Sequence, residues 1–165
     1  MNYDQILNPT IQGIKPSGIR KFFDLLEELG DGISLGVGEP DFVTPWHIRD
    51  AGILSLEKGR TYYTSNSGLF ELREQLCKYF ERRFNLSYKE SEILVTVGGS
   101  EAIDACIRAL VDDGDEVLIP EPSFVCYTPC TILAGGKPVP LVTTQENNFK
   151  LTPEVLKAAI TPKTK

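Results

Sequence analysis

Apolar residues follow two patterns that alternate along the chain. Between residues 69 and 84 they return every three or four positions, as on one face of an amphipathic helix. Short continuous apolar runs, such as 93–97 and 116–119, instead predict buried strands. The pattern predicts helices over 17–29, 45–58, 69–84, 101–111, 124–133 and 153–160, and strands over 33–37, 93–97, 116–119 and 138–142. Strands separated by helices of this length predict an α/β fold, a mainly parallel sheet flanked by helices.

Composition and charge narrow the class of protein. The 165 residues carry a formal net charge of −6 without a basic cluster, so neither nucleic acid nor an anionic membrane is an expected partner. The N-terminus lacks the basic start and apolar core of a signal peptide. No apolar run reaches the length of a membrane span, and we therefore expect a cytoplasmic protein.

Cysteine and histidine usage does not predict a metal site. Without an export signal, the four cysteines are expected to be free, buried thiols. Cys126 and Cys130 are four residues apart, but no second pair or suitable histidine completes a set of four ligands. The single histidine, His47, falls in the first turn of a predicted helix, where a surface or capping role is expected. We therefore expect no metal.

The glycine-rich turn at 36–45 is the first candidate site. An apolar run ends at Gly36 and Gly38, where the absence of a Cβ lets a ligand approach the backbone closely. A dinucleotide-binding fingerprint does not fit, because Asp41 stands where its third glycine belongs and Pro40 interrupts the turn. Pro45 suits the first turn of the following helix. An ordinary strand-to-loop exit is the alternative.

A second candidate turn lies between the predicted strand 93–97 and the helix that follows it. Gly98, Gly99 and Ser100 lead into a helix start, where free backbone N–H groups and the helix dipole favour an anion such as a phosphate monoester. The Ser100 hydroxyl can add a donor. The alternative is that Ser100 only caps the helix.

Two aromatic positions complete the candidate sites. Phe124 falls just past the strand 116–119, at the sheet edge where ligands of parallel sheets gather, and its ring can stack on a flat heteroaromatic ligand. Plain core packing is the alternative for Phe124. In the polar loop 60–68, the hydroxyl of Tyr62 or Tyr63 can reach a phosphate.

The order of these pieces resembles the class I/II aminotransferases that depend on pyridoxal 5′-phosphate, near their aromatic and aspartate subgroups. The resemblance covers essentially all of the chain. It is carried by Gly-x-Gly-Glu-Pro-Asp-Phe-x-Thr-Pro at 36–45, Tyr-x-x-x-x-Gly at 63–68, Gly-Gly-Ser-Glu-Ala at 98–102 and Pro-x-Phe-x-x-Tyr at 122–127. It implies the large domain of fold-type I enzymes, here incomplete, with 1–45 as an N-terminal segment of the small domain and substrate pocket and 46–165 as the first half of the cofactor domain.

The resemblance also implies roles for single residues. Gly99, Ser100 and Glu101 would bind the cofactor phosphate, and Phe124 would stack on its pyridine ring. Tyr63, which keeps the family's distance to Gly68, would reach the phosphate in the neighbouring subunit of a homodimer. Gly38 would line the pocket near the substrate carboxylate. The implied substrates are amino acids and 2-oxo acids.

The sequence departs from the family in what it lacks. The family's Schiff-base lysine, pyridine-nitrogen aspartate and carboxylate-binding arginine match no position here, so no catalytic residue is assigned. We expect a fragment that exposes apolar surface and cannot transaminate alone. Another fold-type I enzyme (a carbon–sulfur lyase, decarboxylase or synthase) and a non-catalytic remnant that pairs with another chain are the alternatives.

Overall fold

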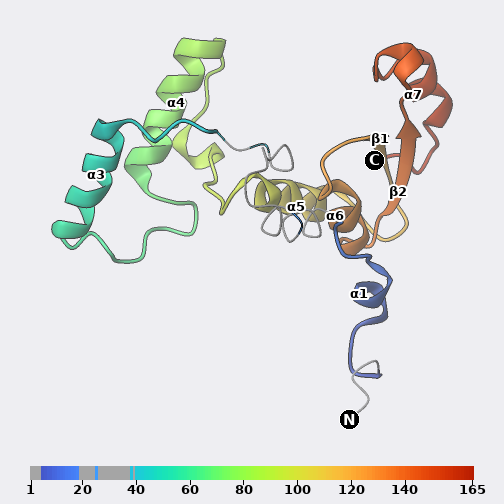
Figure 1. Cartoon of the computed structure of the whole chain (residues 1–165), viewed down its shortest axis with the longest axis horizontal. Helices are drawn as coiled ribbons and strands as arrows, with labels where there is room; N and C mark the ends of the chain where they lie inside the picture. The colour runs from blue at the N-terminus through green and yellow to red at the C-terminus, as the bar shows by residue number, and fades with distance from the viewer. Residues whose placement is uncertain (1–4, 19–24, 26–37, 39) are drawn as a thin grey trace. The chain divides into compact units, whose positions relative to one another are not determined.

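The computed structural model describes residues 5–18, 25, 38 and 40–165 (Figure 1). The chain divides into two compact units, and each is described by itself. The sheet unit comprises residues 1–17 and 96–165, and the helical unit comprises residues 18–95. The expected helix 17–29 lies almost entirely outside the described residues, and the expected strand 33–37 lies wholly outside them.

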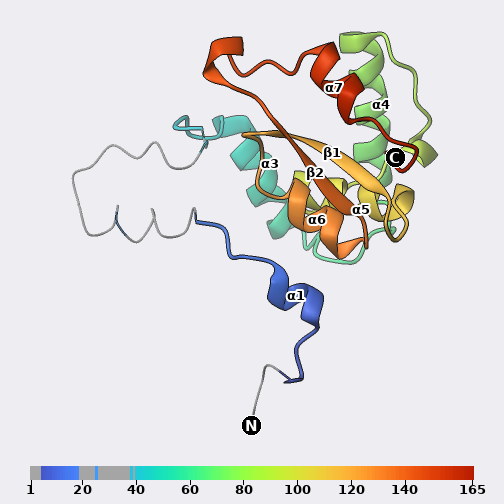
Figure 2. The same ribbon diagram turned by 90° about the vertical axis from the view of Figure 1, so that its right-hand side faces the viewer.

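The sheet unit is built on two parallel strands. Strand β1 (Glu116–Glu121) pairs with β2 (Lys137–Val142) in a register that runs from Glu116 opposite Lys137 to Glu121 opposite Val142. The remaining elements are α1 (Pro9–Gly13), α5 (Gly99–Leu110), α6 (Tyr127–Leu133), the 3-10 turn η3 (Gln145–Asn147) and α7 (Pro153–Ala159). Figure 2 shows β1 and β2 side by side, with α6 packed against them. The fold is therefore α/β with a parallel sheet, as the alternation of elements predicts.

A third segment pairs with β1 on the edge opposite β2. Glu116 forms an isolated parallel bridge with Thr164. The Glu116 N–H donates to the Lys163 carbonyl at 2.8 Å, and the Glu116 carbonyl accepts from the Lys165 N–H at 2.9 Å. Position 116 thus joins three stretches of chain.

The Glu116 side chain strengthens the same junction. Its carboxylate accepts a hydrogen bond from the Thr161 hydroxyl at 2.6 Å and another from Lys137 Nζ at 3.1 Å. Glu116 is only 8% exposed, and these two bonds satisfy a charge that would otherwise be costly to bury. The Thr161 bond, then the Lys137 bond, hold the pKa of Glu116 below its ordinary value.

The buried residues of the described chain all lie in the sheet unit. Ile119 (4% exposed), Leu141 and Cys130 form the apolar core, where β1, β2 and α6 meet. Thr131 is fully buried, and its hydroxyl donates to the Tyr127 carbonyl at 2.8 Å. The apolar face of the sheet thus packs against the apolar side of a helix, as expected for an α/β fold.

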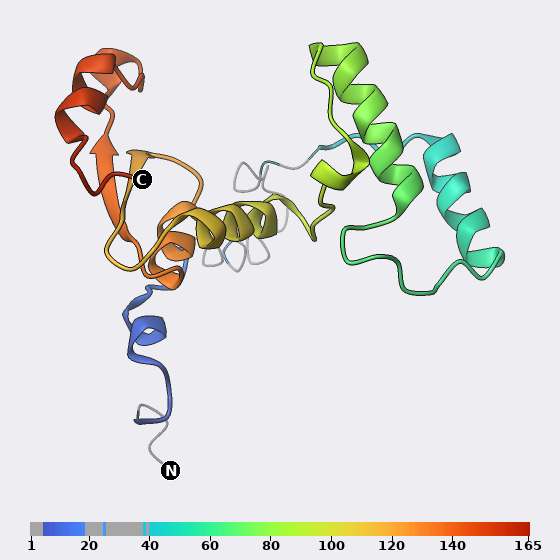
Figure 3. The ribbon, with the colours of Figure 1, turned by 180° about the vertical axis from the view of Figure 1, so that it is seen from behind.

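The helical unit holds α3 (Trp46–Glu57), α4 (Phe70–Phe84) and the 3-10 turn η2 (Glu90–Glu92), and Figure 3 shows the loop that joins α3 to α4. Its described residues include none that is buried. An aromatic cluster packs at the end of α4. The ring centroid of Phe80 lies 5.9 Å from that of Tyr79, 6.0 Å from that of Phe84 and 5.6 Å from that of Tyr88.

Most predicted elements are confirmed with small shifts. Helices α3, α4 and α7 and both strands of the sheet lie within two residues of their predicted bounds. Helix α5 begins at Gly99, two residues early, and α6 begins at Tyr127, three residues late. Thr152 caps α7, since its hydroxyl accepts from the Val155 N–H at 3.4 Å.

The predicted strand 93–97 is wrong. Ile93 has extended backbone angles, but residues 93–97 join no ladder in the described structure. A strand is defined by its neighbour, and here the Val95 N–H donates only to the Ser67 carbonyl at 3.1 Å. An apolar run therefore indicates an extended segment without guaranteeing a partner.

The cysteines differ from the expectation of free, buried thiols in their burial. All four cysteines are free, but only Cys130 is buried, while Cys77 and Cys126 are half-buried and Cys106 is exposed. Burial raises the pKa of the Cys130 thiol. Within the described ranges, none of the helices is both long enough and apolar enough to cross a membrane.

Candidate functional site

The start of α5 presents open backbone donors. The first N–H groups of a helix have no carbonyl partner within it, and here they belong to Gly99, Ser100 and Glu101. Gly98, before them, has φ +84°, a conformation that favours glycine. A Cβ added to Gly98 or Gly99 would meet no atom of the described structure within 4 Å. The turn is therefore open to a ligand that accepts hydrogen bonds.

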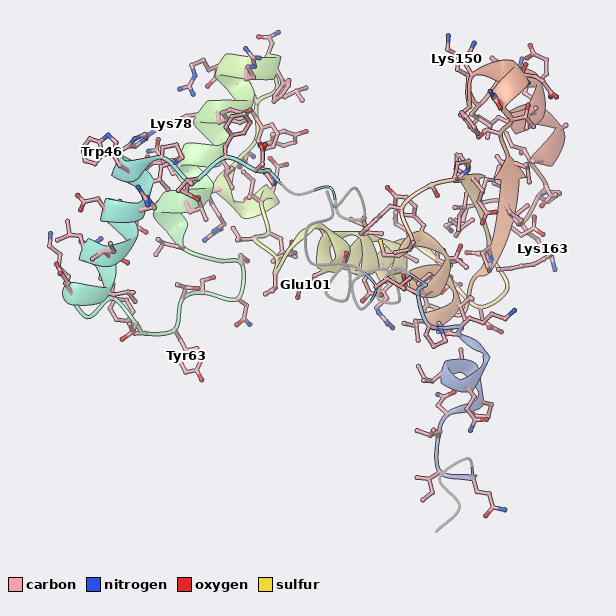
Figure 4. The ribbon with its side chains drawn as sticks, viewed as in Figure 1. Trp46, Tyr63, Lys78, Glu101, Lys150 and Lys163 are labelled. Atoms are coloured by element: carbon pink, nitrogen blue, oxygen red, sulfur yellow. The ribbon has the colours of Figure 1, made fainter. Side chains whose placement is uncertain are left out.

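The Glu101 side chain, not that of Ser100, folds back onto the backbone before this helix. The Glu101 carboxylate accepts a hydrogen bond from the Val97 N–H, and Figure 4 shows Glu101 where α5 begins. The capping alternative for Ser100 is thus wrong, because α5 has Gly98 at its N-cap and no hydroxyl bond there. Among the described residues the Ser100 hydroxyl has no partner. Glu101 can contribute to an anion site through its backbone N–H, while its own negative charge weakens the local positive potential.

Sequence reasoning missed two contacts in the turn. The Thr96 hydroxyl donates to the Gly98 carbonyl at 2.9 Å, which fixes the peptide group that carries the open Gly99 N–H. The Glu101 bond to Val97 was also missed. Its signal was present, because a glutamate three residues after a helix N-cap commonly reaches back to the preceding backbone.

Phe124 lies beside a shallow hollow at the carboxyl end of β1. The hollow has a volume of about 450 Å³, and its lining includes Glu121, Phe124, Val125 and Thr143. Phe124 is 52% exposed, so core packing does not account for it. Its ring meets Tyr127 edge-on, at 5.9 Å between centroids and 86° between planes. The two rings meet edge to face, and at its exposure Phe124 still presents ring surface to a second flat group.

The other two predicted site residues lie in the helical unit. Gly38 is exposed, and a Cβ there would meet nothing within 4 Å. Tyr63 is fully exposed, and Figure 4 shows its side chain extending away from the loop between α3 and α4. The structure thus brings Gly99, Ser100 and Glu101 together, and it places Phe124 in the same unit.

The donor set of the sheet unit fits a phosphorylated, flat ligand. Open amides and a free hydroxyl at a helix start suit a phosphate monoester, and a half-exposed ring at the sheet's carboxyl edge suits a heteroaromatic group. Parallel α/β proteins bind ligands outside the carboxyl ends of their strands. The fold and the turn therefore define an α/β protein with a candidate phosphate turn at the start of α5.

Comparison with known proteins identifies the family. The chain belongs to the family "Aminotransferase class I and II", whose model matches residues 30–165. It is 56% identical to YugH of Bacillus subtilis over 160 residues, which cover 96% of this chain. The name of that relative describes it as an aminotransferase. It is 42% identical to aromatic-amino-acid aminotransferase 2 of Thermococcus litoralis, also over 96% of the chain.

Solved structures agree with the family. The aspartate aminotransferase of Thermus thermophilus, solved with maleate, superposes with a TM-score of 0.88 at 39% identity. The match covers 96% of this chain and 43% of that one. The chain spans about two fifths of the length of the relatives it matches, 42% for YugH and 41% for the Thermococcus enzyme.

Proposed function

We propose that this chain supplies the cofactor-phosphate turn of a pyridoxal 5′-phosphate-dependent amino-acid aminotransferase, which exchanges an amino group between an amino acid and a 2-oxo acid. The observation that carries the proposal is the open turn at the start of α5 in a chain of this family. Gly98, at φ +84°, leads directly into the free N–H groups of Gly99, Ser100 and Glu101, and amides at a helix start favour a bound phosphate.

Each proposed contact has a physical basis in this chain. The N–H groups of Gly99, Ser100 and Glu101, with the Ser100 hydroxyl, would hold the phosphate, and the exposed face of Phe124 would lie on the pyridine ring. When bound, the cofactor withdraws electrons from the amino-acid Cα so that its proton can be removed. Gly38 would leave room for the substrate carboxylate, because it has no side chain.

The assembly belongs to the same proposal. Tyr63 is fully exposed on its loop and would donate to the phosphate of a neighbouring subunit in a homodimer working in the cytoplasm. Residues 1–45 would contribute to the small domain and substrate pocket, and 46–165 would form the first half of the cofactor domain.

Ser100 offers a direct test in the full chain as the cell makes it. We expect Ser100→Ala to weaken pyridoxal-phosphate binding about two- to tenfold, the loss of one hydrogen bond, with little effect on stability because the hydroxyl has no protein partner. Ser55→Ala is the matched control, since that hydroxyl donates to the Gly52 carbonyl at 2.7 Å in α3. Equal affinity for both variants would remove Ser100 from the site.

Product analysis tests the reaction class. An aminotransferase yields a 2-oxo acid together with the aminated cofactor. Release of ammonia or of a cleaved side chain, without the aminated cofactor, would instead assign a lyase of the same fold. For the dimer, Tyr63→Phe should weaken binding of the cofactor only under conditions in which two subunits associate.

A further inference from the structure

Arg108 joins the ends of the two helices that carry the candidate cofactor residues. It lies in the last turn of α5, and its Nε donates to Asp104 Oδ2 at 2.8 Å. Its Nη1 donates to the carbonyl oxygen of Leu133 at 3.2 Å, and Leu133 is the last residue of α6. One guanidinium therefore bridges an acid on its own helix and the terminus of the next.

The Arg108 bond completes the hydrogen bonding at the end of α6. The last carbonyls of a helix have no donor within it. Here the carbonyls of residues 130, 131 and 132 accept from the N–H groups of residues 134, 136 and 135, at 3.1, 2.9 and 3.0 Å. The next carbonyl, that of Leu133, accepts from Arg108. A cation there also complements the negative end of the α6 dipole.

The backbone around this junction leaves little room for movement. A Cβ on Gly136, just after α6, would lie 2.6 Å from Val111 Cγ1 and 3.1 Å from Thr131 Cγ2. The Gly114 N–H donates to the Gly135 carbonyl at 3.0 Å. The carboxyl ends of α5 and α6 are thus packed closely, and Figure 1 shows these two helices side by side.

The opposite ends of the same helices carry the candidate site. Helix α5 begins at Gly99 and Ser100, and α6 begins three residues after Phe124. A helix of seven residues is only about 10 Å long and moves as a rigid rod. A bond that fixes its far end therefore also restricts the turn at its beginning.

We propose that Arg108 is a positioning residue that sets Phe124, through α6, relative to the phosphate turn of α5. This inference rests on the proposed function for its consequence in cofactor binding. Arg108 would act through these two bonds and not by contact with the cofactor. The hydrogen bond and charge of Asp104 raise the pKa of Arg108, so the side chain stays cationic throughout the working pH range.

The test compares three variants of the full chain. Arg108→Ala should weaken pyridoxal-phosphate binding about three- to tenfold and change the induced circular dichroism of the bound cofactor, which reports how its ring is held. Arg108→Lys should restore part of both, because lysine keeps the charge but lacks the planar fork that serves two acceptors. Lys78→Ala, which breaks the exposed Lys78–Glu74 pair on α4, is the matched control.

A second measurement needs no cofactor. The Tyr127 and Cys130 N–H groups donate to the Phe124 and Cys126 carbonyls, at 3.4 and 3.0 Å, where α6 begins. Amide hydrogen exchange at these two positions in the cofactor-free chain should be about three- to tenfold faster in Arg108→Ala than in the wild type, with Arg108→Lys between them. Unchanged exchange would overturn the inference, as would normal affinity and dichroism in a folded Arg108→Ala protein. If the wild type failed to bind pyridoxal phosphate, the proposed function would fall, and the exchange result would still decide the positioning role.

Discussion

The sheet unit and the helical unit are stabilised in different ways. In the sheet unit, β1, β2 and α6 bury Ile119 and Leu141 almost completely. In the described part of the helical unit, α4 instead carries a half-exposed aromatic cluster around Phe80, and α3 exposes large apolar residues such as Ile53 and Leu56. A short parallel strand–helix–strand segment thus makes a small core of its own, whereas α3 and α4 leave apolar surface uncovered.

The largest effect should follow from a change in that core. Ile119→Ala removes three carbons from a side chain that is 4% exposed, and we expect it to lower the free energy of unfolding by about 2 to 4 kcal/mol. Leu56→Ala, on the exposed side of α3, should change it by less than about 0.5 kcal/mol. Chemical denaturation of both variants measures the contrast, and equal losses would mean that the two units do not differ as described.

The aromatic cluster predicts a smaller, local effect. Phe80→Ala removes the ring that meets Tyr79, Phe84 and Tyr88, and each such pair contributes about 0.5 to 1.5 kcal/mol beyond the area it buries. We expect faster amide exchange in α4 and unchanged exchange in β1 and β2. Exchange that increased equally in both units would show that they open as one.

Glu116 predicts a pH dependence that is specific to the sheet unit. Its pKa is lowered in the folded chain, so its stabilising contribution is present above its ordinary value of 4.5 and is lost as the pH falls through the lower, folded value. Glu116→Gln should lower stability at neutral pH, by less than Ile119→Ala, and should flatten this acid dependence. Glu154→Gln, on exposed α7, serves as the control in melting curves from pH 3 to pH 7.

The smallest effect belongs to an exposed ion pair of the helical unit. Lys78 Nζ lies 3.1 Å from Glu74 Oε1 on α4, and their side chains are 56% and 39% exposed. We expect Lys78→Ala to change the free energy of unfolding by about 0.5 kcal/mol or less, and the change should shrink further in high salt. A larger loss would indicate that this surface is covered in solution.

Local patterns in the sequence predicted much of the fold, and for physical reasons. The spacing of apolar residues located α4 and β1, because this pattern depends only on neighbouring residues. The strand expected at 93–97 was wrong because pairing depends on a partner that the run itself does not specify. The bridge between Glu116 and Thr164 could not be found either, since it joins residues far apart in the chain.

In the candidate site too, local sequence predicted some features, whereas contacts between distant residues could not be predicted. The glycines at 98 and 99 predicted an open turn, and the structure shows one. The bond from the Val97 N–H to the Glu101 carboxylate depends on how one side chain folds back, and only the position of the glutamate in the sequence indicated it. The Arg108 bond to Leu133 joins residues that are 25 positions apart on two helices, and no local sequence pattern predicts it.

The junction at Glu116 also bears on the order in which the sheet unit folds. Its bond to Lys137 closes a separation of 21 residues, whereas its bond to Thr161 closes one of 45. The entropic cost of closure grows only with the logarithm of length, so the longer closure costs about 0.7 kcal/mol more. Yet the shorter one is reinforced by six paired positions and the longer by a single bridge. We therefore expect β1, α6 and β2 to assemble first and residues 161–165 to join a sheet that already exists, a sequence that pulse-labelled amide exchange during refolding would resolve.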